Sequence, residues 1–171
     1  IGRAPQGYYA GDGFSTAPDG TTILGAAKLS GKIGEWKLGV LSGVTEREYA
    51  QVEEYGLRSS QEVEPFTWYG VARAQREFAA GRHGLGFIAT GVQRDLNDGA
   101  LAGLLNRSAQ ALGVDGWTFL DAKRNWFISG WLQWYNKTRV AAAGQADLKQ
   151  LNIDGGWDYD AWHAFATAMT S

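Results

Sequence analysis

The chain of 171 residues contains no cysteine and only three prolines. The absence of cysteine excludes disulfide bonds and metal sites built from thiolates. No run of about 18 apolar residues occurs, so the sequence contains no candidate transmembrane helix. Lysine and arginine form no cluster, and the formal net charge is -2. We therefore expect no nucleic-acid partner.

Glycine and aromatic residues are abundant, with 24 Gly, 8 Trp and 7 Tyr. Tryptophan and tyrosine suit either a sugar-binding surface or a membrane interface, where the ring is half in water. The mean hydropathy is slightly negative. A membrane β-barrel remains compatible with that value, because half of the side chains of each barrel strand face a polar interior.

Alternation of apolar and other side chains with a period of two residues predicts β-strands. Six segments show this alternation: 22–30, 36–45, 66–78, 83–94, 111–122 and 125–137. A seventh strand with weaker alternation is predicted to begin near Gly155 and to continue through Trp157, Tyr159 and Phe165. For residues 140–171, this weak alternation is the only basis for the predicted structure.

The connections between these segments alternate between short and long. The short ones are 31–35, 79–82 and 123–125, and the long ones are 47–64, 96–108 and 139–152. Strands of outer-membrane β-barrels run from brief periplasmic turns to longer extracellular loops, which produces this alternation. We therefore predict an all-β fold in which residues 1–171 form an antiparallel up-and-down meander, a single segment of a β-barrel in the bacterial outer membrane.

Two of the long connections contain patterns that favour short helical turns. Thr45 and Glu48 fit a capping box, and Asp98 is a candidate cap for a helix that contains Leu101 and Leu104. Helical turns rich in leucine are expected to pack against the mouth of the barrel.

One side of the predicted strands is apolar and is expected to face lipid. Its clearest members are Trp36, Leu38, Val40, Ile128, Leu132 and Trp134. Trp126 and Trp134 bracket an apolar stretch of roughly 26 Å along the strand, or roughly 20 Å along the membrane normal at a tilt near 40°. The orientation of segment 83–94 stays open, because Leu85 and Phe87 lie on one side while Ile88 lies on the other.

The opposite side carries polar residues that we predict to line the lumen: Lys28, Arg73, Gln75, Arg94, Asp115 and Gln133. Charges of both signs in a lumen form either a water-filled path or a closed network that stabilises the wall. Trp117, Trp131 and Tyr135 lie on the same side, where they either stack on sugars or fill space.

Five blocks of the sequence resemble a known family. They are IGRAPQG at 1–7, TTILGAAKLSG at 21–31, GVLSGVTEREYA at 39–50, VEPFTWYGVARAQREF at 63–78 and GFIATGVQRDLNDGALAGLL at 86–105. In order and spacing they are similar to the membrane-associated β-barrel domain, of unassigned function, that follows a family-9-type carbohydrate-binding module in bacterial envelope proteins. The resemblance covers residues 1–139 and weakens from Val140.

The resemblance implies a location and a fold, and it supplies no catalytic residue. The carbohydrate-binding module is absent from this sequence, so a link to carbohydrate handling is implied only through the family. Seven strands leave two unpaired edges. We expect the lipid bilayer, the remaining strands of a larger barrel or another chain, and a glycan as partners. No signal peptide opens the chain at Ile1, so we expect that it was removed or that the chain is a part of a longer protein.

Our functional prediction is a membrane-embedded module with a structural or transport role, without enzyme activity, cofactor or metal. One alternative is a soluble β-sheet module that binds carbohydrate through its tryptophans and tyrosines. Another is an outer-membrane barrel enzyme whose carboxylates lie in the long loops, among them Glu46, Glu62 and Asp154. His83 and His163 have no evident partner for acid–base catalysis in the sequence.

Overall fold

The computed structural model describes residues 2–5, 13–97, 99–124, 126–139, 148–159 and 162–170. In these ranges the protein is almost entirely antiparallel β-structure, with one short helix. The all-β prediction is therefore confirmed.

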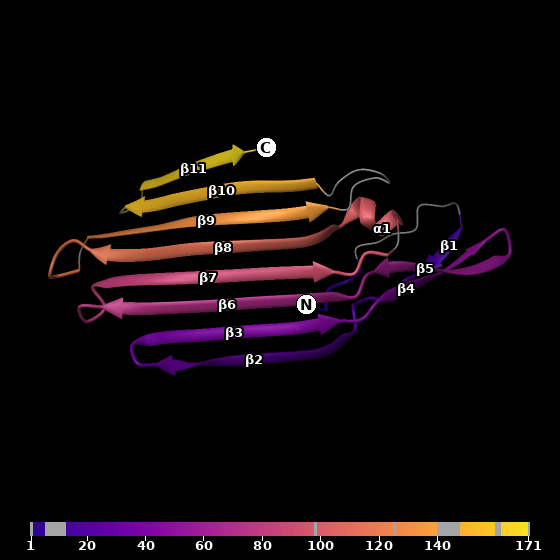
Figure 1. Cartoon of the computed structure of the whole chain (residues 1–171), viewed down its shortest axis with the longest axis horizontal. Helices are drawn as coiled ribbons and strands as arrows, with labels where there is room; N and C mark the ends of the chain where they lie inside the picture. Colours follow the sequence, from indigo (N-terminus) through magenta and orange to yellow (C-terminus); the bar gives the residue numbers. More distant parts are fainter. Residues whose placement is uncertain are drawn as a thin grey trace.

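A sheet of eight antiparallel strands forms most of the molecule (Figure 1). Its strands are β2 (Ile23–Ile33), β3 (Trp36–Thr45), β6 (Thr67–Phe78), β7 (His83–Arg94), β8 (Asn106–Phe119), β9 (Phe127–Arg139), β10 (Leu148–Tyr159) and β11 (Trp162–Thr170). They lie in the order β2-β3-β6-β7-β8-β9-β10-β11, so neighbours in this sheet follow one another along the chain as in a meander. The single interruption is the excursion between β3 and β6.

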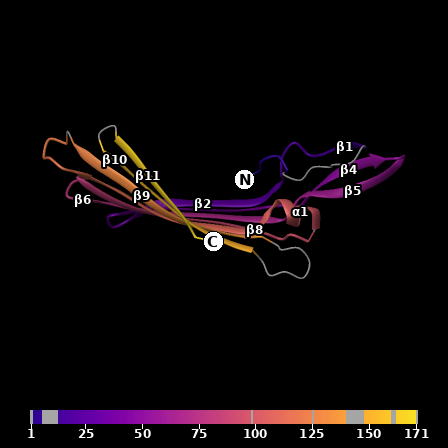
Figure 2. The ribbon, with the colours of Figure 1, turned by 90° about the horizontal axis from the view of Figure 1, so that it is seen from above.

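That excursion belongs to a second, three-stranded sheet in the order β1-β4-β5. Its strands are β1 (Phe14–Thr16), β4 (Glu48–Glu54) and β5 (Leu57–Glu64). The small sheet extends beyond one end of the large sheet, and helix α1 (Gly99–Leu104) lies at the same end (Figures 1 and 2). The long connections thus carry structure of their own.

The short turns gather at the opposite end of the large sheet, which we call the turn end (Figure 1). Residues 34–35 join β2 to β3, 79–82 join β6 to β7, and 120–126 join β8 to β9. Gly34 has a φ of 59°, a conformation that glycine adopts without steric cost and that permits this tight turn. The predicted alternation of short turns and long loops agrees with this arrangement.

The large sheet is a single twisted layer, and β10 and β11 cross the direction of β2 when the sheet is viewed from above (Figure 2). Its large apolar side chains are mostly exposed to solvent. The buried apolar side chains instead gather among the small sheet, α1 and the segment that follows it: Ala50, Val52, Val63, Leu101 and Leu105. We call the end of the large sheet that carries the small sheet and α1 the loop end. Among the residues whose burial is described, the apolar core lies at this loop end, and the faces of β2, β3 and β6 to β9 carry no core.

The helix predicted after Thr45 is wrong, because Glu48–Glu54 is strand β4 and pairs with β5. Oε1 of Glu48 accepts a hydrogen bond from the backbone N–H of Thr22 at 2.6 Å. Its carboxylate therefore joins β4 to the start of β2 and does not cap a helix. The second predicted helix is confirmed as α1, although its expected cap, Asp98, lies outside the described residues.

The weak seventh strand is two strands. Trp157 and Tyr159 belong to β10, whereas Phe165 belongs to β11, which pairs with it in antiparallel fashion. Alternation alone did not separate β10, which ends at Tyr159, from β11, which begins at Trp162. In the described residues, β2 pairs only with β3 and β11 only with β10.

Candidate functional site

The register of the large sheet determines which side chains share a face, because directly opposed residues on neighbouring strands project to the same side. We call the side that carries Arg73 the polar face and the side that carries Val40 the apolar face. All six predicted lumen-lining residues fall on the polar face: Lys28, Arg73, Gln75, Arg94, Asp115 and Gln133. Their role in lining a lumen remains a prediction.

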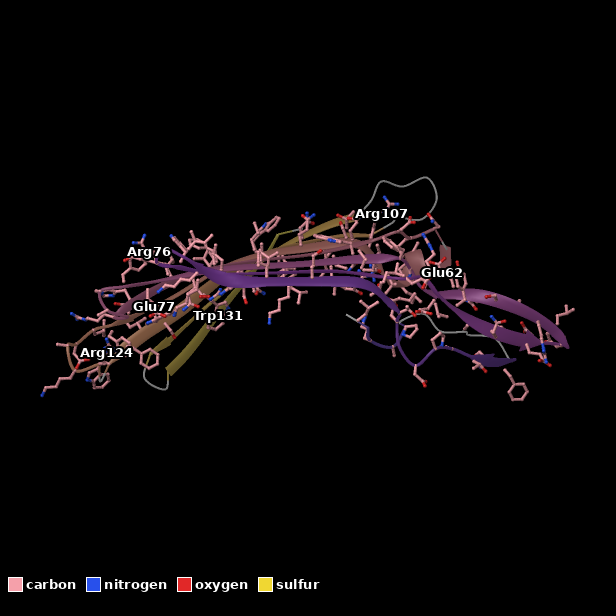
Figure 3. All side chains as sticks on the ribbon, turned by 90° about the horizontal axis from the view of Figure 1, so that it is seen from below. Glu62, Arg76, Glu77, Arg107, Arg124 and Trp131 are labelled. Atoms are coloured by element: carbon pink, nitrogen blue, oxygen red, sulfur yellow. The ribbon has the colours of Figure 1, made fainter. Side chains whose placement is uncertain are left out.

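The six residues predicted to face lipid share the apolar face: Trp36, Leu38, Val40, Ile128, Leu132 and Trp134. Leu85 and Phe87 also belong to this face, while Ile88 lies opposite Arg73 on the polar face. The orientation of β7, which alternation left open, is therefore resolved by its register. In Figure 3, Arg76 of the apolar face lies on one side of the ribbon, and Glu77 and Trp131 of the polar face lie on the other.

An ion pair on the polar face spans strand β7. Nη2 of Arg73, on β6, donates a hydrogen bond to Oδ1 of Asp115, on β8, at 2.6 Å, and the same guanidinium also contacts Oδ2. A second ion pair joins Nζ of Lys37 to Oε1 of Glu77 at 2.5 Å. Both pairs are partly exposed, so each contributes little to stability by itself. Their main consequence is that these four charges balance.

Gly86 provides the space through which Arg73 reaches Asp115. A Cβ atom at this position would lie 2.4 Å from Oδ1 of Asp115 and 2.5 Å from Nη2 of Arg73. Gly86 is the direct partner of Asp115 on β8 and of Gln75 on β6. The ion pair therefore lies directly over the backbone of β7, and a side chain at residue 86 would displace it.

Gly86→Ala is expected to lower the free energy of unfolding by at most about 1 kcal/mol, because the added methyl group separates Arg73 from Asp115, but both are flexible, partly exposed side chains that can move aside. Gly39→Ala is the matched control. Gly39 lies on the same face opposite Arg73, and a Cβ there meets no atom within 4 Å. The control should be neutral or stabilising by up to about 1 kcal/mol. Urea unfolding of the full chain would compare them, and equal stability of the two variants would contradict the steric role of Gly86.

Two indole rings lie near this ion pair. Trp117 packs over Gly84, where a Cβ would lie 2.2 to 2.4 Å from three consecutive atoms of the ring. Trp131 is the direct partner of Asp115 on β9, and 40% of its surface is exposed. Further towards the loop end, the polar face has a shallow hollow of about 460 Å³ whose lining includes Tyr69, Val71 and Tyr135. The polar face thus combines two ion pairs with exposed aromatic surface.

Arg94 lies apart from this cluster, at the loop end of β7. Its Nη1 donates a hydrogen bond to the backbone oxygen of Asn106 at 2.9 Å, which links β7 to the start of β8. The exposed Lys28 lies on the outer strand β2, opposite Leu41. Of the six predicted residues, Arg73 and Asp115 are therefore the two that the structure brings into contact.

Other charged side chains connect the small sheet to the large one. Arg47 pairs with both Glu62 and Asp95; its Nη1 lies 2.8 Å from Oε1 of Glu62. Arg3 lies 3.5 Å from the buried carboxylate of Glu64. Several loop carboxylates are therefore engaged in ion pairs that hold the loop end together.

Sequence reasoning missed the contribution of Gly84 and Gly86. Each is opposed on β8 by a bulky or charged residue, Trp117 and Asp115 respectively. The spacing of two glycines at alternate positions of one strand is a signal for close approach of neighbouring side chains. Without the register, however, the sequence does not say which side chains occupy that space.

The scan against family models matched none, and the searches of curated proteins and of solved structures also found no match. Within the described ranges, no helix is long and apolar enough to cross a membrane. In the same part of the chain, no group of three or more His, Cys, Asp or Glu is placed to hold a metal ion.

Proposed function

We propose that the chain forms part of the wall of a bacterial outer-membrane β-barrel and has a structural or transport role. The observation that carries this proposal is the division of the large sheet into two faces by its register. Among the described residues, the apolar face exposes side chains over several strands, and no layer packs on it; 57% of Leu132 and 51% of Val40 are exposed. Exposure of so much apolar surface to water is unfavourable, so lipid is the more suitable environment for this face.

The ends of the apolar face fit this orientation. Its middle is formed by residues such as Ala72, Phe87 and Leu112, whereas polar side chains follow towards both ends. At the loop end these are Gln93, Ser108, Gln110, Asn136 and Thr138, and at the turn end Arg76, His83 and Thr118. An apolar band between polar borders is the pattern of a strand that crosses a bilayer.

Aromatic residues near the borders of the apolar face support the same interpretation. Trp36 and Phe78 belong to the turn end, and Trp68 belongs to the loop end. Nε1 of Trp68 donates a hydrogen bond to Oγ of Ser42 at 2.9 Å, which satisfies the polar edge of the ring. Aromatic rings with one apolar and one polar edge are typical of the interface between lipid and water.

The polar face is assigned to the interior of the barrel, where water solvates charges that lipid does not. Arg73, Asp115 and Gln133 would then lie along a path through the lumen. In a barrel the edges β2 and β11 need partner strands, either each other or strands of another segment or chain. A link of this interior to carbohydrate handling is part of the proposal and is developed below.

Reconstitution of the full chain into lipid vesicles tests the membrane assignment. We expect the strands β6 to β9 to be protected from added protease and to show β-structure only in the presence of lipid or detergent. A chain that remains monodisperse and fully folded in buffer without detergent would instead identify a soluble β-sheet module. Turnover of a glycan or lipid that is lost on replacing loop carboxylates would identify an enzyme.

Arg73→Glu is expected to change ion selectivity if the polar face lines a water-filled path. The substitution places a second carboxylate beside Asp115, so the path should favour cations more than in the wild type. The matched control is Lys123→Glu, which makes the same change of charge in the exposed turn between β8 and β9. Planar-bilayer recordings with a salt gradient would measure reversal potential and conductance.

Unchanged reversal potential and conductance in Arg73→Glu would remove Arg73 from the path. A wild-type barrel without any conductance would favour a closed polar network that stabilises the wall.

A further inference from the structure

Trp117 and Trp131 flank the Arg73–Asp115 ion pair on the polar face. Trp131 lies directly opposite Asp115, which brings the Cβ atoms of such a pair to about 4.5 to 5.5 Å. Trp117 follows Asp115 by two positions on β8 and therefore projects to the same face. These four side chains from β6, β8 and β9, which we call the cluster, thus lie beside one another on the polar face near the turn end.

The backbone of β7 supports one face of the Trp117 ring. The three ring atoms nearest to a Cβ built on Gly84 are consecutive, and their distances are almost equal, 2.2, 2.3 and 2.4 Å. This geometry places Gly84 beneath the flat face of the ring and not at its edge. The ring is therefore held parallel to the sheet, and its other face points away from the sheet.

Within the cluster, the charge of Arg73 is balanced by that of Asp115, which limits the ligands that fit. Further along the face Lys37 is paired with Glu77, and Lys32 adds a further positive charge directly opposite Lys37. The Arg73–Asp115 pair still offers N–H donors and carboxylate acceptors to hydroxyl groups, and it carries no net charge that would select an anion or a cation. A neutral ligand with many hydroxyl groups and flat C–H surfaces satisfies both the indole rings and the ion pair.

We propose that Trp117, Trp131, Arg73 and Asp115 form a binding site for neutral carbohydrate. The site rests on the proposed function only in its location, the interior of the barrel. Gln133 continues the polar face of β9 beyond Trp131, and Tyr135 follows at a distance of about 13 Å from Trp131 along the strand. Nζ of Lys137 lies 5.4 Å from the centroid of the Tyr135 ring, so stacking of sugar is assigned to the two tryptophans.

The test measures binding of the neutral oligosaccharides maltohexaose and cellohexaose to the full chain by titration calorimetry. The protein is kept in a zwitterionic detergent without a sugar headgroup, because a maltoside headgroup would compete for the site. Trp131→Ala is expected to weaken binding by about tenfold, the loss of one stacked ring. Trp131→Phe keeps an aromatic face and should retain most of the affinity.

Trp134→Ala is the matched control, because Trp134 lies on the same strand but on the apolar face. It should leave oligosaccharide affinity unchanged. Gly84→Ala tests the support of Trp117: the added methyl group displaces the ring without removing it, and affinity should fall. Asp115→Asn leaves Arg73 without its charge partner, so a carboxylated hexasaccharide should gain affinity relative to maltohexaose.

The site is refuted if the wild type binds neither oligosaccharide at millimolar concentration, or if Trp131→Ala binds as tightly as Trp134→Ala. These results leave membrane insertion untouched, because insertion is measured separately by protease protection in vesicles. Conversely, a chain that binds both oligosaccharides in detergent-free buffer and does not enter vesicles would retain the carbohydrate site and refute the barrel.

Discussion

Leu132→Arg is expected to destabilise the chain in a lipid bilayer by about 2 to 4 kcal/mol, whereas Gln133→Arg should have little effect. The two residues are neighbours on β9, both are exposed, and the register places them on opposite faces. In lipid, a charge on the apolar face near the middle of the band loses its hydration. A charge on the polar face keeps it if water fills the interior.

Equilibrium folding of both variants into vesicles, with urea as denaturant, would measure this difference. Because length, charge and position along the strand are matched, a general effect of arginine on β-structure cancels. Equal folding free energies for the two variants would refute the lipid-facing orientation of the apolar face. A soluble sheet would give that result, since an exposed arginine on either face would then contact water. Val40→Arg, on β3, should repeat the loss seen for Leu132→Arg.

The sequence predicted the faces of the large sheet well because each face has a different physical environment. Where the apolar residues alternate strictly with others, as in 36–45 and 66–78, the period of two residues predicts both the strand and its two sides. The register then aligns these sides across neighbouring strands, since a shift by one residue would place apolar and polar side chains on the same face. Alternation within single strands was therefore sufficient to group five of the six polar residues, whereas Arg94 belongs to β7, whose orientation only the register resolves.

The sequence alone did not predict which side chains contact one another. Arg73 and Asp115 are 42 residues apart, and they meet only because β7 lies between their strands with Gly86 at the crossing point. That crossing depends on the two turns that connect β6 to β7 and β7 to β8. The second of these connections contains helix α1. Local patterns do not predict such a register.

The error at Glu48–Glu54 has a different cause. Thr45 and Glu48 match the spacing of a capping box, but Glu48 accepts its hydrogen bond from Thr22, which is distant in sequence. In addition, Ala50 and Val52 alternate with exposed residues and are buried in the core at the loop end. Tertiary contacts outweighed a weak local preference, as is common for short segments.

The second large expected effect is a loss of stability on replacing Leu101, which belongs to the core at the loop end. Leu101 is 2% exposed and lies on α1, which contacts β5. Its backbone oxygen also accepts a hydrogen bond from the N–H of Leu105 at 2.8 Å. Leu101→Ala removes buried methyl groups and leaves a cavity, so we expect a loss of about 2 to 5 kcal/mol in the stability of the loop end.

Leu104→Ala is the control for this change, because Leu104 belongs to the same helix and is 45% exposed. Both variants replace a leucine of α1 with alanine, and they differ in how deeply that leucine is buried. Hydrogen exchange would be measured at the backbone amides of β4 and β5, with amides of β6 and β7 as the reference. Leu101→Ala should accelerate exchange in β4 and β5 and leave the reference amides unchanged, because the large sheet takes its stability from its own ladder and its surroundings. Equal acceleration in both variants, or equal acceleration in both sheets, would show that α1 does not hold the small sheet at the end of the large one.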